Sequence, residues 1–201
     1  MMRTAIGAPN AALSGRAHQN FHKTVLRRNL FLYAMTTTKN EPVKNVTMYT
    51  DGACLGNPGP GGYGVILKYN HQEKELSAGY RLTTNNRMEL MAAIQGLAAL
   101  KTKCTVTLYS DSQYIVDAVN KGWARSWKAK GWMRNKKDAA SNPDLWDALL
   151  TLVDKHSVTF VWVRGHAGHP GNERCDVLAV NAAKYSKLLV DEKYEKKDTG
   201  Y

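Results

Sequence analysis

Alternating apolar and polar residues predict three strands in the first part of the sequence. Residues 46–51 alternate in this way, and the strand that they predict ends at Asp51. The β-rich segments 63–69 and 75–82 are separated by a short polar loop, which predicts a hairpin. Strands joined by such short turns pair antiparallel.

Helical segments alternate with strands in the rest of the sequence. Thr84 can cap a helix over residues 85–101, and a further helix begins at Asn142-Pro143. The remaining elements, in chain order, are a strand over 104–110, a helix over 112–120, a strand over 158–163 and a helix over 172–187. Strands reached through helical crossovers pair in parallel. We therefore predict an α/β fold with a single mixed five-stranded sheet, three antiparallel strands and then two parallel ones, flanked by helices.

A glycine-rich segment, residues 56–62, follows the first strand and is predicted to form a hairpin turn. Together with Tyr63 and Gly64 it satisfies the G-x-G-x-x-G pattern of dinucleotide-binding sites. That chemistry requires the pattern to lead into a helix whose amides meet the phosphates. A strand-like segment follows here, and Pro60 removes an amide donor, so we disfavour a nucleotide cofactor site.

Composition narrows the class of protein. The chain has 201 residues, of which 43% are apolar, which predicts one globular domain. No apolar run approaches the ~20 residues of a membrane span, so we predict no membrane-spanning segment. Cys54, Cys104 and Cys175 form neither a disulfide framework nor a zinc knuckle, which favours a reducing compartment. The protein is expected to be cytoplasmic and monomeric.

The formal net charge of +11 arises in two segments of the chain. Residues 1–34 hold five basic residues, residues 118–137 hold seven, and neither segment holds an acidic residue. The remaining residues sum to −1, so the excess charge is local. It predicts an anionic partner, with nucleic acid, a membrane surface and an acidic protein as the alternatives.

The N-terminal basic segment belongs to an extension, residues 1–43, that we predict to be disordered. Its basic, acid-poor composition also fits an organellar transit peptide, which would change the expected compartment. Such peptides are rich in serine, whereas this segment has a single serine before residue 35. The folded domain is predicted to cover residues 44–190, followed by a C-terminal tail over residues 191–201.

Four acidic residues lie at strand ends or on inward-facing helix surfaces. Asp51 and Asp111 follow strands, where open α/β sheets place their sites. Glu89 and Asp176 share helix faces with small residues that suit close packing on a sheet. Each acid taken singly could be a cap, a turn residue or a solvated charge.

The four acids taken together favour a metal site. Converging carboxylates repel each other, and a bound divalent cation resolves that repulsion. Oxygen ligation favours Mg²⁺ or Mn²⁺, and two such ions can clamp the oxygens of a phosphodiester displacement.

Two histidines, His166 and His169, lie in a glycine-rich loop before the last predicted helix. A zinc site needs further His or Cys ligands, and Cys175 is the only nearby candidate, so we disfavour zinc. His166 beside the acids could instead move a proton. His169 is interpreted as a turn residue.

Four segments together resemble the bacterial ribonuclease H, type I, family. They are residues 50–64, 84–90, 111–114 and 165–176, and the resemblance extends in register over residues 44–201, including the final residues 198–201. It implies a ribonuclease H-like fold and an endonuclease that hydrolyses the RNA strand of RNA–DNA hybrids, leaving 5′-phosphate and 3′-hydroxyl ends. The hybrid-binding domain that eukaryotic members carry is not recognisable in this sequence.

The same resemblance implies roles for individual residues. The family would bind two Mg²⁺ ions together with substrate, with Mn²⁺ as a substitute. Their ligands would be Asp51, Glu89, Asp111 and Asp176. His166 would assist proton transfer or product release. The residues that match positions near the minor groove of the hybrid are Cys54, Asn57, Asn85, Asn86 and Gln113. Amide side chains offer donors and acceptors to the 2′-hydroxyls that distinguish RNA from DNA.

The second basic segment interleaves tryptophans with basic residues. Trp123, Trp127 and Trp132 alternate with residues that include Lys128 and Lys130. One interpretation is a solvated basic face whose indoles pack into the core. The resemblance implies a basic protrusion that grips the phosphates of the DNA strand, and both can hold because indoles can pack while lysines project.

Two other functions use the same features. A strand transferase with a similar acid cluster would act on DNA duplexes, and the compact chain without a further DNA-binding domain speaks against it. A non-catalytic nucleic-acid module would be expected to lack at least one of the four acids, and all four are present.

Overall fold

A computed structural model describes residues 43–198 of the chain; the predictions for residues 1–42 and 199–201 lie outside the described residues. Five strands form one sheet in the order β3-β2-β1-β4-β5. Their bounds are β1 (Lys44–Cys54), β2 (Gly59–Tyr69), β3 (Gln72–Thr83), β4 (Cys104–Ser110) and β5 (Ser157–Trp162). The first three pair antiparallel, and β4 and β5 extend the sheet in parallel from β1. The predicted fold class is confirmed.

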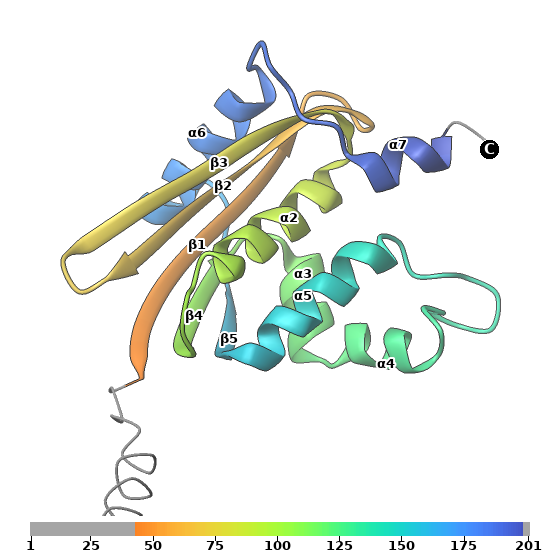
Figure 1. Cartoon of the computed structure of the whole chain (residues 1–201), viewed down its shortest axis with the longest axis horizontal. Helices are drawn as coiled ribbons and strands as arrows, with labels where there is room; N and C mark the ends of the chain where they lie inside the picture. The colour runs from red at the N-terminus through yellow and green to blue at the C-terminus, as the bar shows by residue number, and fades with distance from the viewer. Residues whose placement is uncertain (1–42, 199–201) are drawn as a thin grey trace, which may run out of the picture. The chain divides into compact units, whose positions relative to one another are not determined.

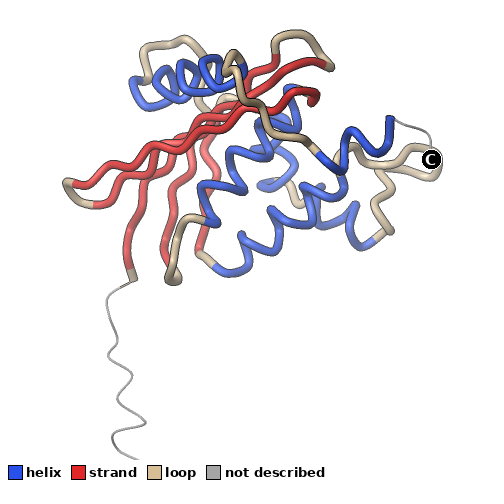
Figure 2. Tube along the Cα trace, turned by 45° about the horizontal axis from the view of Figure 1, so that its top comes forward, coloured by secondary structure: helices blue, strands red, loops and turns tan. Residues whose placement is uncertain are grey.

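The helices cover both faces of this sheet. They are α2 (Asn85–Ala98), α3 (Gln113–Asn120), α4 (Trp123–Ala129), α5 (Pro143–Lys155), α6 (Pro170–Ala183) and α7 (Glu192–Asp198). Figures 1 and 2 show α6 on one face and α2, α3 and α5 on the other. No helix in the described part of the chain is long and apolar enough to cross a membrane.

The main core lies between the sheet and α2, α3 and α5. Its fully buried members include Met48 on β1, Leu108 on β4, Leu97 on α2 and Trp146 on α5. Buried residues recur at every second position over residues 46–50 of β1 and along β4, which is why the alternating pattern in the sequence identified these strands.

The first two strands are longer than the sequence pattern indicates. β1 does not end at Asp51 but continues to Cys54, and β2 already begins at Gly59. Cys54 pairs with Gly61, so most of the glycine-rich segment predicted as a turn is strand. The absence of side chains there serves packing, since a Cβ on Gly62 would lie 2.5 Å from the carbonyl oxygen of Ala179 on α6.

The segment between α6 and α7 returns to the edge of the sheet. The N–H of Leu189 donates to the carbonyl of Gly79, and the N–H of Arg81 donates to the carbonyl of Leu189. Asp191, where the sequence predicts a C-terminal tail to begin, is buried and forms an ion pair with Arg87 on α2. This segment is therefore held to the rest of the described domain by main-chain and side-chain bonds.

We predict that Arg87→Ala lowers the free energy of unfolding by about 3–5 kcal/mol, because it leaves the carboxylate of Asp191 buried without its cation. Urea denaturation measures this change. The matched control is Arg174→Ala, which breaks the exposed pair with Glu75 and should cost far less, because solvent screens that pair. Equal losses for the two variants would contradict the expectation.

Candidate active site

The pairing of two parallel strands brings Asp51 and Asp111 together. The last paired residues of β1 and β4 are Thr50 and Ser110, so the two aspartates follow at the same level of neighbouring strands. Asp51 remains within β1 and is 6% exposed, while Asp111 comes directly after β4 and is partly buried. This is the convergence that the two strand ends predict, although β1 runs on past its acid.

Close packing of α2 on β1 adds a third carboxylate. A side chain on Gly52 would overlap the backbone nitrogen of Glu89, so only glycine allows the helix to approach at this position. Glu89 is 6% exposed. One carboxylate oxygen from each of Asp51, Glu89 and Asp111 lies within 4.8 Å of the other two.

The fourth predicted acid, Asp176, lies on α6 on the opposite face of the sheet. Gly64 pairs with Asp51, and a side chain on Gly64 would overlap the carbonyl oxygen of Cys175. The turn of α6 that carries Asp176 therefore lies against the strand position next to Asp51. Asp176 is partly buried and is not a member of the three-carboxylate group, but its charge acts on Asp51.

Burial and mutual repulsion perturb the titration of this cluster. Loss of hydration raises the pKa of Asp51 to about 8, and the charges of Asp111 and Asp176 add to the rise. Burial, followed by the charges of Asp51 and Asp111, raises the pKa of Glu89 well above its ordinary value. No ion pair between side chains of the described residues neutralises any of these acids.

Unsatisfied oxygen atoms make the cluster suited to a cation. Glu89 Oε2, Asp111 Oδ1 and Asn172 Oδ1 are buried without a hydrogen-bond partner. The amide of Asn172 donates to Asp111 Oδ2 at 3.2 Å, and the backbone N–H of Gly52 donates to Asp51 Oδ1 at 2.7 Å. Oxygen-only donors of this kind fit a divalent cation such as Mg²⁺ or Mn²⁺.

Comparison with known proteins agrees with this geometry. The RNase H family model matches residues 43–184. The chain is 64% identical over 157 residues to a ribonuclease H of Desulforamulus reducens, covering 78% of this chain and 99% of that protein. The chain belongs to the ribonuclease H family. High identity over the relatives' whole length shows that it is a ribonuclease H enzyme, as the sequence motifs predicted.

Further relatives and a solved structure support the ribonuclease H assignment. Ribonuclease HI of Synechocystis is 56% identical over 163 residues, covering 81% of this chain and 99% of that protein. LC9-RNase H1, described as a type 1 RNase H with the type 2 active-site motif, is 36% identical with a TM-score of 0.65. That alignment covers 79% of this chain and 82% of the solved chain. The ribonuclease H fold is therefore shown by both sequence and structure.

The loop that carries His166 adjoins the acid cluster. His166 is exposed and has a left-handed backbone, with φ of 52°. Its neighbour Gly165 lies against Asp111, because a Cβ on Gly165 would be 2.7 Å from Asp111 Oδ2. His169 occupies the N-cap position directly before α6.

The residues predicted to contact the minor groove lie on β1, the turn after it, α2 and α3, close in sequence to the acids. Cys54 ends β1, and its thiol donates to the carbonyls of Gly59 and Thr83, each at 3.5 Å. Asn57 Oδ1 accepts a hydrogen bond from the backbone N–H of Asn85, the first residue of α2. The two remaining predicted contacts, Asn86 and Gln113, are exposed.

The tryptophans of the basic segment differ in exposure. Trp127 is 9% exposed and packs edge-on against Trp146, with ring centroids 5.8 Å apart. Trp132 is partly buried against the same core. Trp123 is 43% exposed, and Lys121 lies over its ring. Of the three indoles, Trp123 therefore presents the largest surface to a ligand, whereas Trp127 fixes α4 to the core.

The basic side chains fall into two groups. Those on or near α4 form ion pairs with acids of neighbouring helices: Lys121 with Asp117, Arg125 with Asp154 and Lys128 with Asp147. The remaining four are exposed and form no side-chain ion pair with another described residue: Lys130, Arg134, Lys136 and Lys137. Residues 130–137, which we call the basic loop, thus carry the uncompensated charge of this segment.

Two further residues of the site, Asn172 and Gly165, contact Asp111 but are not predicted from the sequence. Asn172 lies four residues before Asp176, one helical turn away, and that spacing on the small-residue face was the available signal. Gly165 is found only from its contact with Asp111, and no local pattern in the sequence identifies it.

We predict that Asp51→Asn stabilises the metal-free protein at pH 7 by on the order of 1–3 kcal/mol. At a pH between the ordinary pKa of 3.8 and the folded-state pKa of about 8, the Asp51 carboxyl is ionised in the unfolded chain but protonated in the folded chain. Stability therefore falls as pH rises through this window, and the amide removes that loss. Thermal melts in a chelator at pH 4 and pH 8 test this. A variant that is less stable at pH 8 would contradict it.

We predict that Gly165→Ala weakens Mg²⁺ or Mn²⁺ binding about tenfold while the fold stays intact. The atoms nearest the added methyl group belong to the Asp111 side chain, the carboxylate Oδ2 first at 2.7 Å, so the change disturbs the ligand rather than the backbone. Calorimetric metal titration and a thermal melt measure the two effects. Unchanged metal affinity would contradict the prediction.

Proposed function

We propose that this ribonuclease H hydrolyses the RNA strand of RNA–DNA hybrids with two Mg²⁺ ions, which Mn²⁺ can replace, giving 5′-phosphate and 3′-hydroxyl ends. The observation that carries the proposal is the buried group of Asp51, Glu89 and Asp111, whose oxygens lie within 4.8 Å and in part lack partners. Such a group tolerates its own charge when cations occupy it.

Different residues of the site would bind the metal ions, orient the ligands and bind the hybrid. Asp51, Glu89, Asp111 and Asp176 would hold the ions, which activate water and stabilise the leaving oxygen of a phosphodiester. Asn172 would keep the carboxylate of Asp111 oriented through its 3.2 Å hydrogen bond. The other groups around the site would bind the hybrid.

The hybrid would contact two surfaces beside the acids. Cys54, Asn57, Asn85, Asn86 and Gln113 would face the minor groove, where the 2′-hydroxyls lie. The basic loop and Trp123 would contact the DNA strand, with Lys130 at the start of the loop. Contacts to phosphates do not depend on sequence, and their affinity falls with salt.

His166 would serve proton transfer or product release from its exposed loop. The neighbouring Gly165 lies against Asp111, which supports a place for His166 beside the cluster. A histidine in such a place can exchange protons with solvent and with the reacting groups.

We predict that the protein cleaves a labelled RNA–DNA hybrid in Mg²⁺, and that Asp51→Asn lowers the rate by at least about 10³-fold, because it removes one carboxylate from the ion-holding group. Gel analysis of the labelled RNA measures the rate and the chemistry of the ends. Equal cleavage by both proteins would overturn the proposal. Cleavage or joining of duplex DNA with no action on the hybrid would favour a strand transferase instead.

We predict that Lys130→Ala combined with Lys136→Ala weakens hybrid binding and lowers the slope of log affinity against log salt by about 2. Fluorescence anisotropy with a hybrid in Ca²⁺ measures binding at several salt concentrations. Lys128→Ala is the matched control, since Lys128 forms a 2.7 Å ion pair with Asp147 and should change the slope less. An unchanged slope in the double variant would remove the basic loop from the binding surface.

A further inference from the structure

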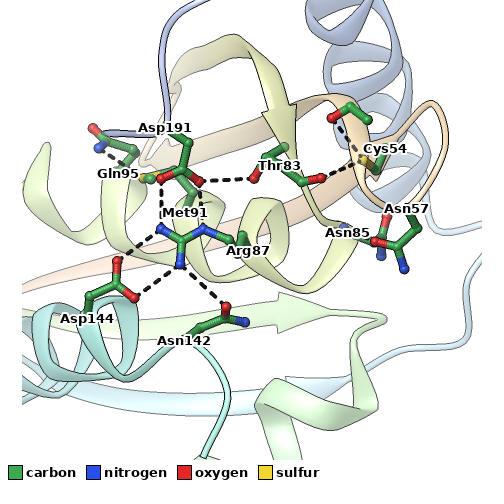
Figure 3. A network of polar contacts seen from close by, with 11 residues as sticks. Cys54, Asn57, Thr83, Asn85, Arg87, Met91, Gln95, Asn142, Asp144 and Asp191 are labelled. Carbon is green, nitrogen blue, oxygen red and sulfur yellow. Dashed lines mark hydrogen bonds and ion pairs between the residues drawn. The ribbon is translucent and has the colours of Figure 1, made fainter. Parts of the chain in front are cut away.

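Arg87 is the centre of a buried polar network that joins three distant parts of the chain (Figure 3). Arg87 is only 3% exposed. Its guanidinium donates to both carboxylate oxygens of Asp191, at 2.6 and 2.8 Å. It also donates to both oxygens of Asp144, at 3.1 and 2.9 Å, and to Asn142 Oδ1 at 3.4 Å. The planar fork of arginine makes these bonds in fixed directions, which a lysine ammonium does not.

One side of the network leads to the residues proposed to contact the minor groove. The hydroxyl of Thr83 donates to Asp191 Oδ2 at 3.1 Å, and the carbonyl of the same threonine accepts from the thiol of Cys54. Arg87 lies two residues after Asn85 on α2, and Asn85 is bonded to Asn57. Figure 3 shows Thr83 between Asp191 and Cys54, with Asn57 and Asn85 next to each other on the Cys54 side.

The other side of the network leads to the base of the basic loop. Asn142, with φ of 56°, precedes α5, and Asp144 lies in the first turn of that helix. The chain just before them is tied back to the core, since the N–H of Ala140 donates to the carbonyl of Trp132. The bonds from Arg87 to Asn142 and Asp144 therefore fix the point from which the loop emerges.

We propose that Arg87 is a positioning residue, which holds the basic loop at a fixed place relative to the minor-groove amides so that one hybrid meets both surfaces. The inference rests on the proposed function, because it assigns both surfaces to one ligand. Two surfaces that are fixed relative to each other bind a stiff duplex without a further ordering cost, whereas a loose loop incurs that cost at each binding event.

Packing alone does not explain the composition of this network. A buried ion pair is often no more stabilising than apolar residues of the same volume, but its bonds impose one geometry. Asp144 illustrates the point: burial alone would raise its pKa, yet the hydrogen bonds and charge of Arg87 hold the pKa below its ordinary value. The carboxylate is therefore kept ionised and bonded to the fork at neutral pH.

Asp144→Asn tests the inference with little change of shape. The expected result is a KM for the hybrid raised at least fivefold, kcat within twofold and unchanged metal affinity, measured well below the melting temperature of the variant. Asn142→Gly keeps the left-handed backbone and should move KM in the same direction by a smaller factor. The matched control is Glu195→Gln, which breaks the bidentate bond between α7 and Arg81 without touching Arg87 and should leave KM within 1.5-fold.

A second measurement separates positioning from mere stabilisation. Lys130→Ala should weaken hybrid binding about fivefold in the unmodified protein and in Glu195→Gln, but less than twofold when Asp144→Asn is already present. A purely structural role lowers the melting temperature and leaves the effect of Lys130→Ala the same in every background, which would overturn the inference. Failure of the unmodified protein to cleave any hybrid would overturn the proposed function, so the two failures are distinguishable.

Discussion

The mutual repulsion of buried carboxylates is the constraint on which the structure of this site depends. Asp51, Glu89 and Asp111 bring oxygens within 4.8 Å of one another in a setting where two of the three residues are only 6% exposed. Burial of unpaired charge destabilises a fold, and the raised pKa of Asp51, about 8, reflects that unfavourable energy. A divalent cation converts the same oxygens into ligands, so stability and metal binding are linked through one group of atoms.

The backbone enforces this convergence with pairings and glycines. The register of β1 with β4 places Asp51 and Asp111 at one level, while Gly52 and Gly64 allow α2 and α6 to approach the sheet from opposite faces. The helices are in direct contact with the strands. They therefore cannot shift away from the sheet to separate the carboxylates. The site is therefore rigid where the charges meet, and the exposed loop with His166 lies beside it.

Much of the fold and the acids could be predicted because both depend on local patterns. Alternation identified the strands, and small residues on one helix face pointed to Glu89. The pairing of Cys54 with Gly61, which turns the glycine segment into strand, depends on tertiary packing against α6. The bond between Arg87 and Asp191 joins residues 104 positions apart in the sequence. The ion pair between Lys128 and Asp147 compensates the charge of that lysine, whereas the lysines of the basic loop have no such pair among the described residues. Neither contact has a local signal in the sequence.

The most direct test of the linkage between buried charge and metal is the count of protons released on binding. Mg²⁺ or Mn²⁺ is titrated into the protein at pH 7 in two buffers of different ionisation enthalpy. Because the pKa of Asp51 is about 8 and that of Glu89 is also raised, metal binding should release at least about one proton for each protein molecule. Binding without proton release, or no binding at this cluster, would contradict the linkage.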